Sequence, residues 1–164
     1  GGWELRESVS AVRDYADIWL TDLKYFDNNL AEKFSNAPKY FDTASAALHQ
    51  MVEQTGEPVF DGSGMMKRGI IVRHLMLPGH LDDTKKVIKY LWDTYGNSIW
   101  ISIMNQYTPL CNDERYPELF RKVSDAEYNE AIDYAYDLGI ENAFIQEGGT
   151  AEESFIPPFD LEGV

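Results

Sequence analysis

Apolar residues recur along the chain in two alternating patterns, one with helical spacing and one in short continuous runs. Helical spacing predicts amphipathic helices over residues 4–16, 42–55, 82–96 and 124–139, with a shorter helix over residues 116–123. The continuous runs predict strands over residues 17–24, 69–77, 99–104 and 143–146. The run over residues 69–77 is apolar at both odd and even positions, which is typical of a strand covered on both faces.

Helices and strands that alternate in this way are typical of parallel βα units, so we predict an α/β fold with right-handed crossovers. Four strands are too few for a closed barrel of eight. The pattern therefore fits either a small open sheet or an arc cut from a barrel, and the strand ends favour the arc. Residues 1–146 are expected to form this unit. Residues 147–164, which contain two consecutive prolines, are expected to form an extended tail that either packs across a barrel rim or docks elsewhere.

The charge and the cysteine content exclude several classes of function. Acidic residues outnumber basic ones by 28 to 14, and the net charge of −14 repels phosphate, which argues against a nucleic acid partner and against an anionic membrane. No apolar run reaches the ~20 residues of a membrane span. A single cysteine, Cys111, can form neither an internal disulfide nor a cysteine-rich metal or cluster site. These features fit a reducing compartment, so we expect a cytoplasmic protein.

Candidate ligand-binding residues lie at the strand ends, because parallel α/β folds bind ligands at the carboxyl ends of their strands. Asp22 and Lys24 end the first strand and share one side of it. Such a pair can bind a ribose hydroxyl and a carboxylate, or it can be a solvated pair at a strand exit. Arg73, in the second strand, needs a carboxylate from a ligand or from a residue such as Asp22. We expect Asp22, Lys24 and Arg73 to converge on one concave face.

The other polar residues near the strands give weaker signals. Gln106 and Tyr107 follow the third strand and either line a pocket or satisfy a turn. His74 shares its face of the second strand with apolar residues, which favours a hydrogen-bonded histidine under a helix. The three histidines show no ligand spacing, so no metal site is predicted. No catalytic triad order, phosphate-binding loop or dinucleotide fingerprint occurs in the sequence, and no catalytic residue is predicted.

Three stretches, residues 22–24, 72–79 and 104–109, together resemble the C-terminal half of the radical S-adenosylmethionine (SAM) proteins related to pyruvate formate-lyase activating enzyme. The resemblance covers nearly all of residues 1–150, and the strand with Arg73 is its most specific part. It implies an arc of a partial (β/α)6 TIM-like barrel. In this family a [4Fe-4S] cluster binds SAM and cleaves it reductively to a 5′-deoxyadenosyl radical. In activating enzymes that radical takes a hydrogen atom from a glycine of a partner enzyme.

The resemblance also implies which residues bind SAM. Asp22 and Lys24 match the family's Asp-x-Lys motif, whose residues contact SAM, and Arg73 matches a barrel arginine near the same ligand. Gln106 or Tyr107 falls where the family has a histidine on its sixth strand, so the ribose contact differs from the family pattern. The family's three-cysteine cluster loop and its Gly-Gly-Glu motif precede the matching segment, and neither is present in this sequence.

We therefore expect the C-terminal part of a radical SAM oxidoreductase of the activating-enzyme type, with a glycyl-radical enzyme or another protein substrate as its partner. Its cofactors would be SAM and, in the parent protein only, a [4Fe-4S] cluster. The chain begins with two glycines and no methionine, which fits a processed start or an internal segment, and alone it is expected to be inactive. The alternative is a non-enzymatic α/β module that binds a small ligand or a protein; three closely spaced cysteines upstream would favour the enzyme.

Overall fold

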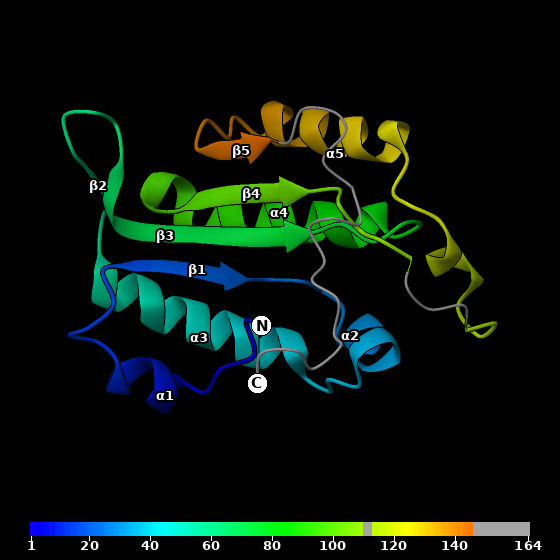
Figure 1. Cartoon of the computed structure of the whole chain (residues 1–164), viewed down its shortest axis with the longest axis horizontal. Helices are drawn as coiled ribbons and strands as arrows, with labels where there is room; N and C mark the ends of the chain where they lie inside the picture. The colour runs from blue at the N-terminus through cyan, green and yellow to red at the C-terminus, as the bar shows by residue number, and fades with distance from the viewer. Residues whose placement is uncertain (110–112, 146–164) are drawn as a thin grey trace, which may run out of the picture.

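The computed structural model describes residues 1–109 and 113–145, which form an α/β fold with a mostly parallel sheet (Figure 1). The sheet has the strand order β1-β3-β4-β5, and neighbouring strands of this path are parallel. A short strand, β2, pairs antiparallel with the start of β3. The strands are β1 (Ile18–Asp22), β2 (Val59–Phe60), β3 (Met66–Leu75), β4 (Trp100–Met104) and β5 (Ala143–Ile145). The predicted α/β class with parallel βα units is thus confirmed.

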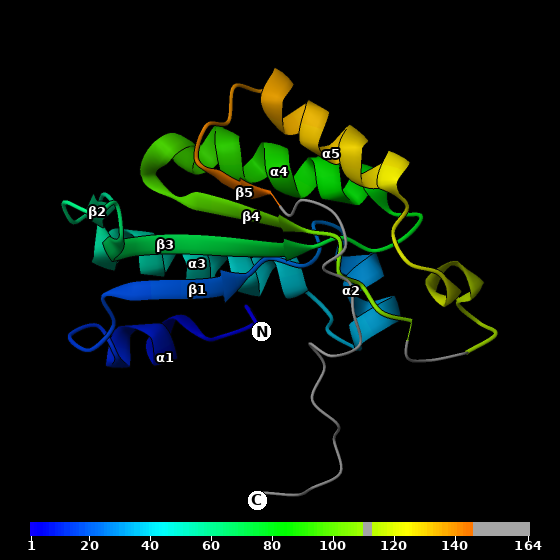
Figure 2. The ribbon, with the colours of Figure 1, turned by 45° about the horizontal axis from the view of Figure 1, so that its top comes forward.

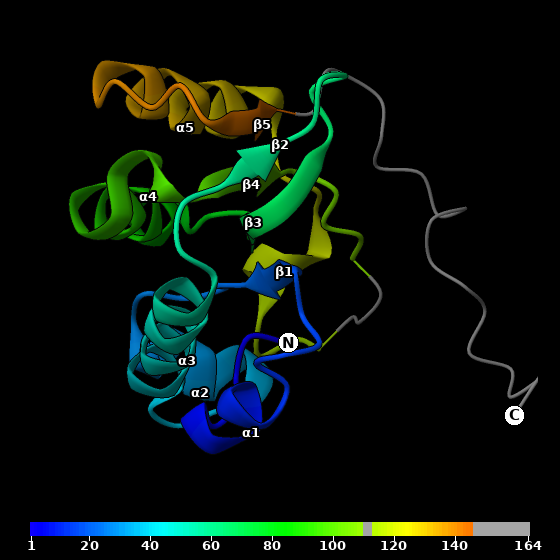
Figure 3. The same cartoon turned by 90° about the vertical axis from the view of Figure 1, so that its left-hand side faces the viewer.

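Three long helices connect successive parallel strands and cover one face of the sheet, as Figure 3 shows. The helices are α1 (Arg6–Ala11), α2 (Asn28–Ser35), α3 (Tyr40–Thr55), α4 (Leu81–Tyr95) and α5 (Asp125–Asp137), with two 3-10 turns, η1 (Gly96–Ser98) and η2 (Pro117–Phe120). The core lies between the helices and the sheet, because β3 and the residue after it bury Ile70, Val72 and Met76 completely on this side. Burial of such side chains stabilises a fold by roughly 1.5 to 3 kcal/mol each.

The opposite face of the sheet is not covered by any helix among the described residues. The strand register places on it Ile18, Leu20, Asp22, Ile71, Arg73, Leu75, Trp100, Ser102, Met104 and Phe144, which we call the open face. Ile18, Leu20 and Phe144 have 44, 56 and 46% of their surface exposed. The expectation that the second strand is covered on both faces was therefore wrong for the described residues. Its odd-numbered apolar residues lie on the open face and are half-buried by their neighbours.

The helix boundaries differ from the prediction in three places. The helix expected over residues 4–16 extends only from Arg6 to Ala11, and α2 was not predicted. The segment expected as a short helix over residues 116–123 contains the 3-10 turn η2. The other predicted helices and all four predicted strands are present. The tail of residues 147–164 lies outside the described residues, so the predicted division of the chain stays a prediction. Within the described part, no helix is long and apolar enough to cross a membrane.

Candidate functional site

The carboxyl ends of β1, β3 and β4 lie at the same edge of the sheet, on the right in Figure 1. Asp22, the last residue of β1, is in register with Arg73 of β3. The Arg73 Nε and Nη2 atoms lie 2.8 and 2.7 Å from Asp22 Oδ1. Asp22 is 13% exposed and Arg73 is 39% exposed. The structure therefore brings Asp22 and Arg73 together, and it leaves the guanidinium partly open to the outside.

The Asp22–Arg73 pair borders a hollow of about 220 Å³ that Gly1, Gly2, Glu4, Trp19, Leu20, Thr21 and Met51 also line. Pockets that enclose a drug-sized ligand have volumes of ~300 to 1,000 Å³. The hollow is therefore large enough for part of such a ligand only. Its walls combine two carboxylates and a guanidinium with the apolar side chains of Trp19, Leu20 and Met51, which suits a ligand that carries both charged and apolar groups.

The Tyr40 hydroxyl links the N-terminal residues to the segment that follows β1, and Figure 2 shows the N-terminus beside the end of this strand. The Tyr40 hydroxyl accepts a hydrogen bond from the Lys24 N–H at 3.0 Å and donates one to the Gly1 carbonyl oxygen at 3.2 Å. Burial raises the pKa of this hydroxyl, so it stays protonated and keeps its donor. Gly2 has a φ of +83°, and a Cβ there would collide with the Asp22 carbonyl oxygen. This approach therefore requires glycine.

Lys24 lies two residues beyond Asp22 and borders a neighbouring hollow. The two hollows share Gly1 and Glu4 as lining residues. The Lys24 side chain is half-buried and forms no ion pair with a described residue. Its ammonium is thus free for an anionic group of a ligand. Of the three residues expected to converge on one concave face, Asp22 and Arg73 line the same hollow, whereas Lys24 lines the neighbouring one.

Gln106 and Tyr107 follow β4 at the same edge of the sheet but lie in different surroundings from each other. The Gln106 amide donates to the Met104 sulfur at 3.6 Å, and Met104 belongs to the open face. The Tyr107 hydroxyl donates to the Leu119 carbonyl oxygen at 3.1 Å. Tyr107 also borders a separate cavity of about 290 Å³ that is lined by Tyr25, Phe34, Leu77, Asp113, Tyr116 and Leu119. Tyr107 is therefore not among the residues that line the hollow at Asp22 and Arg73.

His74 fastens the end of β1 to β3 and to the start of α4. The ring is fully buried, with Nδ1 at 2.9 Å from the Leu23 carbonyl oxygen and Nε2 at 3.0 Å from Thr84 Oγ1. Burial lowers its pKa, so the ring is neutral near pH 7, donates from Nδ1 and accepts the Thr84 hydroxyl at Nε2. His74 is thus a hydrogen-bonded histidine under a helix, as expected, and it positions the strand end that carries Asp22.

Three residues at this edge were not predicted from the sequence. Glu4 lines the hollow and accepts the Gly2 N–H at 3.2 Å, whereas the predicted helix had included it. The only sequence signal for this position of Glu4 was the pair Gly1 and Gly2, because glycines allow a close approach of the backbone. Tyr40 begins a helix and gave no signal, and Ser102 is placed beside Arg73 only by the register of β4. No group of three or more metal-ligating side chains occurs in residues 1–109 and 113–145.

Comparisons with known proteins indicate a distant relationship. No family model matches the chain. An uncharacterized protein of Methanocaldococcus jannaschii is 26% identical over 137 residues, which are 82% of this chain and 36% of that protein. The chain thus spans about a third of the length of this relative. A crystal structure of a domain of pyruvate-formate lyase-activating enzyme from Bacteroides vulgatus has a TM-score of 0.59 and 16% identity, and the match covers 86% of this chain and 74% of that domain. This likeness shows a similar α/β fold.

Proposed function

We propose that the chain is part of a radical SAM enzyme related to pyruvate formate-lyase activating enzyme, and that the hollow at Asp22 and Arg73 binds one part of SAM. The observation that carries this proposal is the Asp22–Arg73 pair at the carboxyl ends of two neighbouring parallel strands, with the unpaired Lys24 beside it. The similarity in fold to a domain of an activating enzyme supports it.

The barrel arc is the second part of the proposal. Strands that follow one another in the sheet in chain order, with every long connecting helix on one face, are typical of a barrel wall. A doubly wound sheet has helices on both faces. The open face would then line the interior of the barrel, and Asp22, Arg73 and Ser102 would lie near its upper rim.

The residues present fit SAM but not an iron–sulfur cluster. Asp22 can accept hydrogen bonds from a ribose hydroxyl or an ammonium group, and Lys24 can donate to a carboxylate. Arg73 uses Nε and Nη2 for Asp22 and makes no hydrogen bond through Nη1 to a described residue, so donors remain for a ligand. One cysteine cannot replace the three thiolates of a cluster loop. The cluster of the parent protein would supply the electron that cleaves SAM, and the residues of this chain would hold and orient SAM.

Gln106 and Tyr107 are proposed to complete the site at the end of β4. Gln106 is the better placed of the two, because its amide lies against Met104 of the open face. Tyr107 borders the neighbouring cavity, where it would contact a protein substrate rather than SAM. A glycyl-radical enzyme is the proposed partner at this edge, since the family acts on such enzymes.

Titration of SAM into the full chain by calorimetry tests the proposal, with Lys24→Ala as the diagnostic variant. Loss of one charge-assisted hydrogen bond costs ~1.5 to 3 kcal/mol, so the affinity should fall about 10- to 100-fold. Lys67→Ala is the matched control, because Lys67 lies at the opposite end of β3 and pairs with Asp61. Absence of SAM binding by the unaltered chain would contradict the site. Equal binding by both variants would contradict the role of Lys24.

A non-enzymatic binding module is the second candidate function, and the cavity beside Tyr107 favours it. Four of its seven lining residues are aromatic, with Tyr25, Phe34 and Tyr116 besides Tyr107. Such a lining suits a small apolar or aromatic ligand. Binding of phenol in this cavity, detected by NMR in a chain that does not bind SAM, would favour the module over the enzyme.

A further inference from the structure

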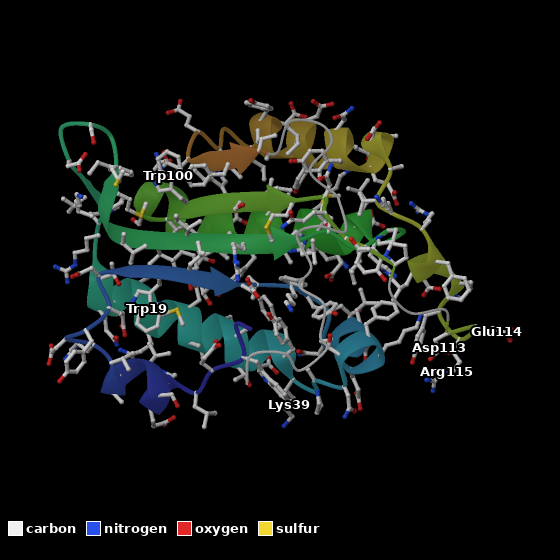
Figure 4. The ribbon with its side chains drawn as sticks, in the orientation of Figure 1. Trp19, Lys39, Trp100, Asp113, Glu114 and Arg115 are labelled. Atoms are coloured by element: carbon white, nitrogen blue, oxygen red, sulfur yellow. The ribbon has the colours of Figure 1, made fainter. Side chains whose placement is uncertain are left out.

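The cavity beside Tyr107 lies at the edge of the sheet where parallel α/β folds bind their ligands. Its walls come from α2, from the segments that follow β1, β3 and β4, and from the chain around η2. We call it the aromatic cavity, and its lining residues are Tyr25, Phe34, Leu77, Tyr107, Asp113, Tyr116 and Leu119. Figure 4 shows Asp113 beyond the carboxyl ends of the strands, on the right. The volume of about 290 Å³ exceeds that of a cavity of ~150 Å³ that holds benzene, so a small organic ligand fits.

Four aromatic side chains form most of the wall of the aromatic cavity. Tyr25 is buried, and Phe34, Tyr107 and Tyr116 are half-buried. The rings of Phe34 and Tyr116 meet nearly at right angles, with an interplanar angle of 79° and centroids 5.4 Å apart. The face of an aromatic ring carries partial negative charge. Several such rings around one cavity suit the head group of a quaternary ammonium ligand.

Two cations of the chain already lie over these rings. The Lys33 Nζ atom is 4.6 Å from the ring centroid of Phe34 and 5.3 Å from that of Tyr116. The guanidinium carbon of Arg115 is 5.3 Å from the Tyr116 centroid. All three distances are within the ~6 Å over which an aromatic face attracts a cation. Lys33 and Arg115 are not among the residues that line the cavity, so they leave its interior to a ligand.

The charges around the cavity favour a cationic ligand over an anionic one. Lys33 Nζ lies 2.7 Å from Glu118 Oε1, and the Arg115 guanidinium pairs with Asp113, so both cations are neutralised by carboxylates. The hydrogen bonds from Arg115 lower the pKa of Asp113 to about 2, so this residue of the wall is ionised at neutral pH. An anionic ligand would meet this carboxylate and the negative faces of the rings. The net charge of −14 also attracts cations to the chain.

We propose that the aromatic cavity binds a small organic cation with a quaternary ammonium head group. The rings of Phe34 and Tyr116 attract the positive charge, and a neutral ligand of the same shape binds more weakly. This proposal narrows the ligand of the second candidate function from an apolar or aromatic molecule to a cation. It rests on the cavity alone and holds whether or not the chain binds SAM, so its test is run without SAM.

Choline and neohexanol test the role of the charge in the full, unaltered chain. Neohexanol is the neutral isostere of choline, in which a tert-butyl group replaces the trimethylammonium group. Titrations are followed by NMR through the backbone amides of Phe34 and Leu119, with sodium chloride at equal ionic strength as the control. Choline should bind about 10-fold more tightly than neohexanol, because cation–π attraction in a partly desolvated site supplies this factor. Equal affinities, or no binding of choline, would overturn the proposal. Equal affinities would still leave the apolar ligand of the second candidate function, and neither result bears on SAM.

A peptide with one trimethylated lysine distinguishes a head group on a protein from one on a free small molecule. If this peptide binds more tightly than choline, the source of the cation is a methylated protein. If it binds more weakly, the source is a free quaternary ammonium compound. Both results support the cavity as a cation site. Equal binding of the methylated and unmethylated peptides would contradict recognition of the quaternary head group.

Tyr116→Leu tests the ring itself, because leucine keeps an apolar wall but has no negative face. It should weaken choline binding about 3- to 30-fold, and Tyr116→Phe, which keeps the ring, should lose less. Tyr136→Leu is the matched control, since Tyr136 lies on α5, is 65% exposed and does not line the cavity. Urea unfolding shows whether each variant is folded, and the comparison of choline with neohexanol needs no variant. Unchanged choline affinity in folded Tyr116→Leu and Phe34→Leu would overturn the proposal.

Discussion

Replacement of His74 by glutamine should remove the part of the loss of folding stability that His74 causes below pH 6.5. The ring is fully buried between the end of β1 and the start of α4, and burial lowers its pKa below the ordinary value of 6.5. In the unfolded chain His74 therefore binds a proton near pH 6.5, whereas in the folded chain it does so only at a lower pH. His74 thus contributes its full stability above pH 6.5, and this contribution is lost as the pH falls below that value.

The size of the effect follows from the linkage of one proton. Below pH 6.5 the free energy of unfolding falls by up to ~1.4 kcal/mol per pH unit until the folded state is protonated as well. Between pH 7.5 and 5.5 the loss amounts to at most about 1.4 kcal/mol, which is the value for a ring that takes up no proton in the folded state. For a chain of this length that loss lowers Tm by about 3 to 6 °C. Carboxylates contribute little here, because they titrate in the unfolded chain near pH 4.

Urea unfolding at pH 7.5, 6.5 and 5.5 is the suitable assay, followed by circular dichroism. The unaltered chain should lose stability over this range, and the free energy of unfolding of His74→Gln should depend less steeply on pH, even if its stability at pH 7.5 is lower. His80→Gln is the matched control, because burial also lowers the pKa of His80, but its side chain is 20% exposed and its effect should be smaller. Parallel pH dependences of the unaltered chain and His74→Gln would refute the reasoning.

Two further substitutions test the contacts that hold the same edge of the sheet. Glu127→Ala should lower the free energy of unfolding by about 2 to 3 kcal/mol, because Glu127 accepts from Gly79 N and both Arg121 Nη atoms and completes the capping box of α5. Arg121 lowers the pKa of Glu127, so this contribution is present above pH ~4.3 and is lost as the pH falls below it. The control is Glu130→Ala, which removes an exposed ion pair and should change stability by less than ~1 kcal/mol at pH 7. Equal losses of stability in Glu127→Ala and Glu130→Ala would contradict the role assigned to Glu127. Asp83→Asn should cost about 2 kcal/mol, because each carboxylate oxygen accepts one N–H, from Phe26 or Asp27, and the NH2 group that replaces one oxygen would face a donor. A thermal midpoint that does not change would exclude this role.

The elements that the sequence predicted best are those whose pattern is local and unambiguous. The apolar run that forms most of β3 and the capping box of Ser124 and Glu127 both appear where they were expected. α2 escaped prediction because Asp27 and the two asparagines after it are typical of a turn, and the helix buries only Ala31 completely. Asp27 does cap this helix, since its side chain accepts the Asn29 N–H.

The site could be predicted only as far as it depends on strand ends. Arg73 was expected to need a carboxylate from a ligand or from a residue such as Asp22, and the structure supplies Asp22. Glu4 and Tyr40 reach the site through the path of the N-terminal residues, which no periodic pattern encodes. The first predicted helix was too long for the same reason. Its apolar spacing continues to Ala16, but Val12 is 40% exposed, so little apolar burial would stabilise a longer helix.

The order of the strands has a consequence for how the chain assembles during synthesis. β4 pairs with β3 after the connection that contains α4, and β5 pairs with β4 after the connection that contains α5. Each unit can therefore settle on a finished neighbour as soon as it leaves the ribosome, without waiting for distant residues. The edge of β4 presents unpaired backbone groups until β5 pairs with it, so a pause in translation after β4 would prolong the exposure of that edge.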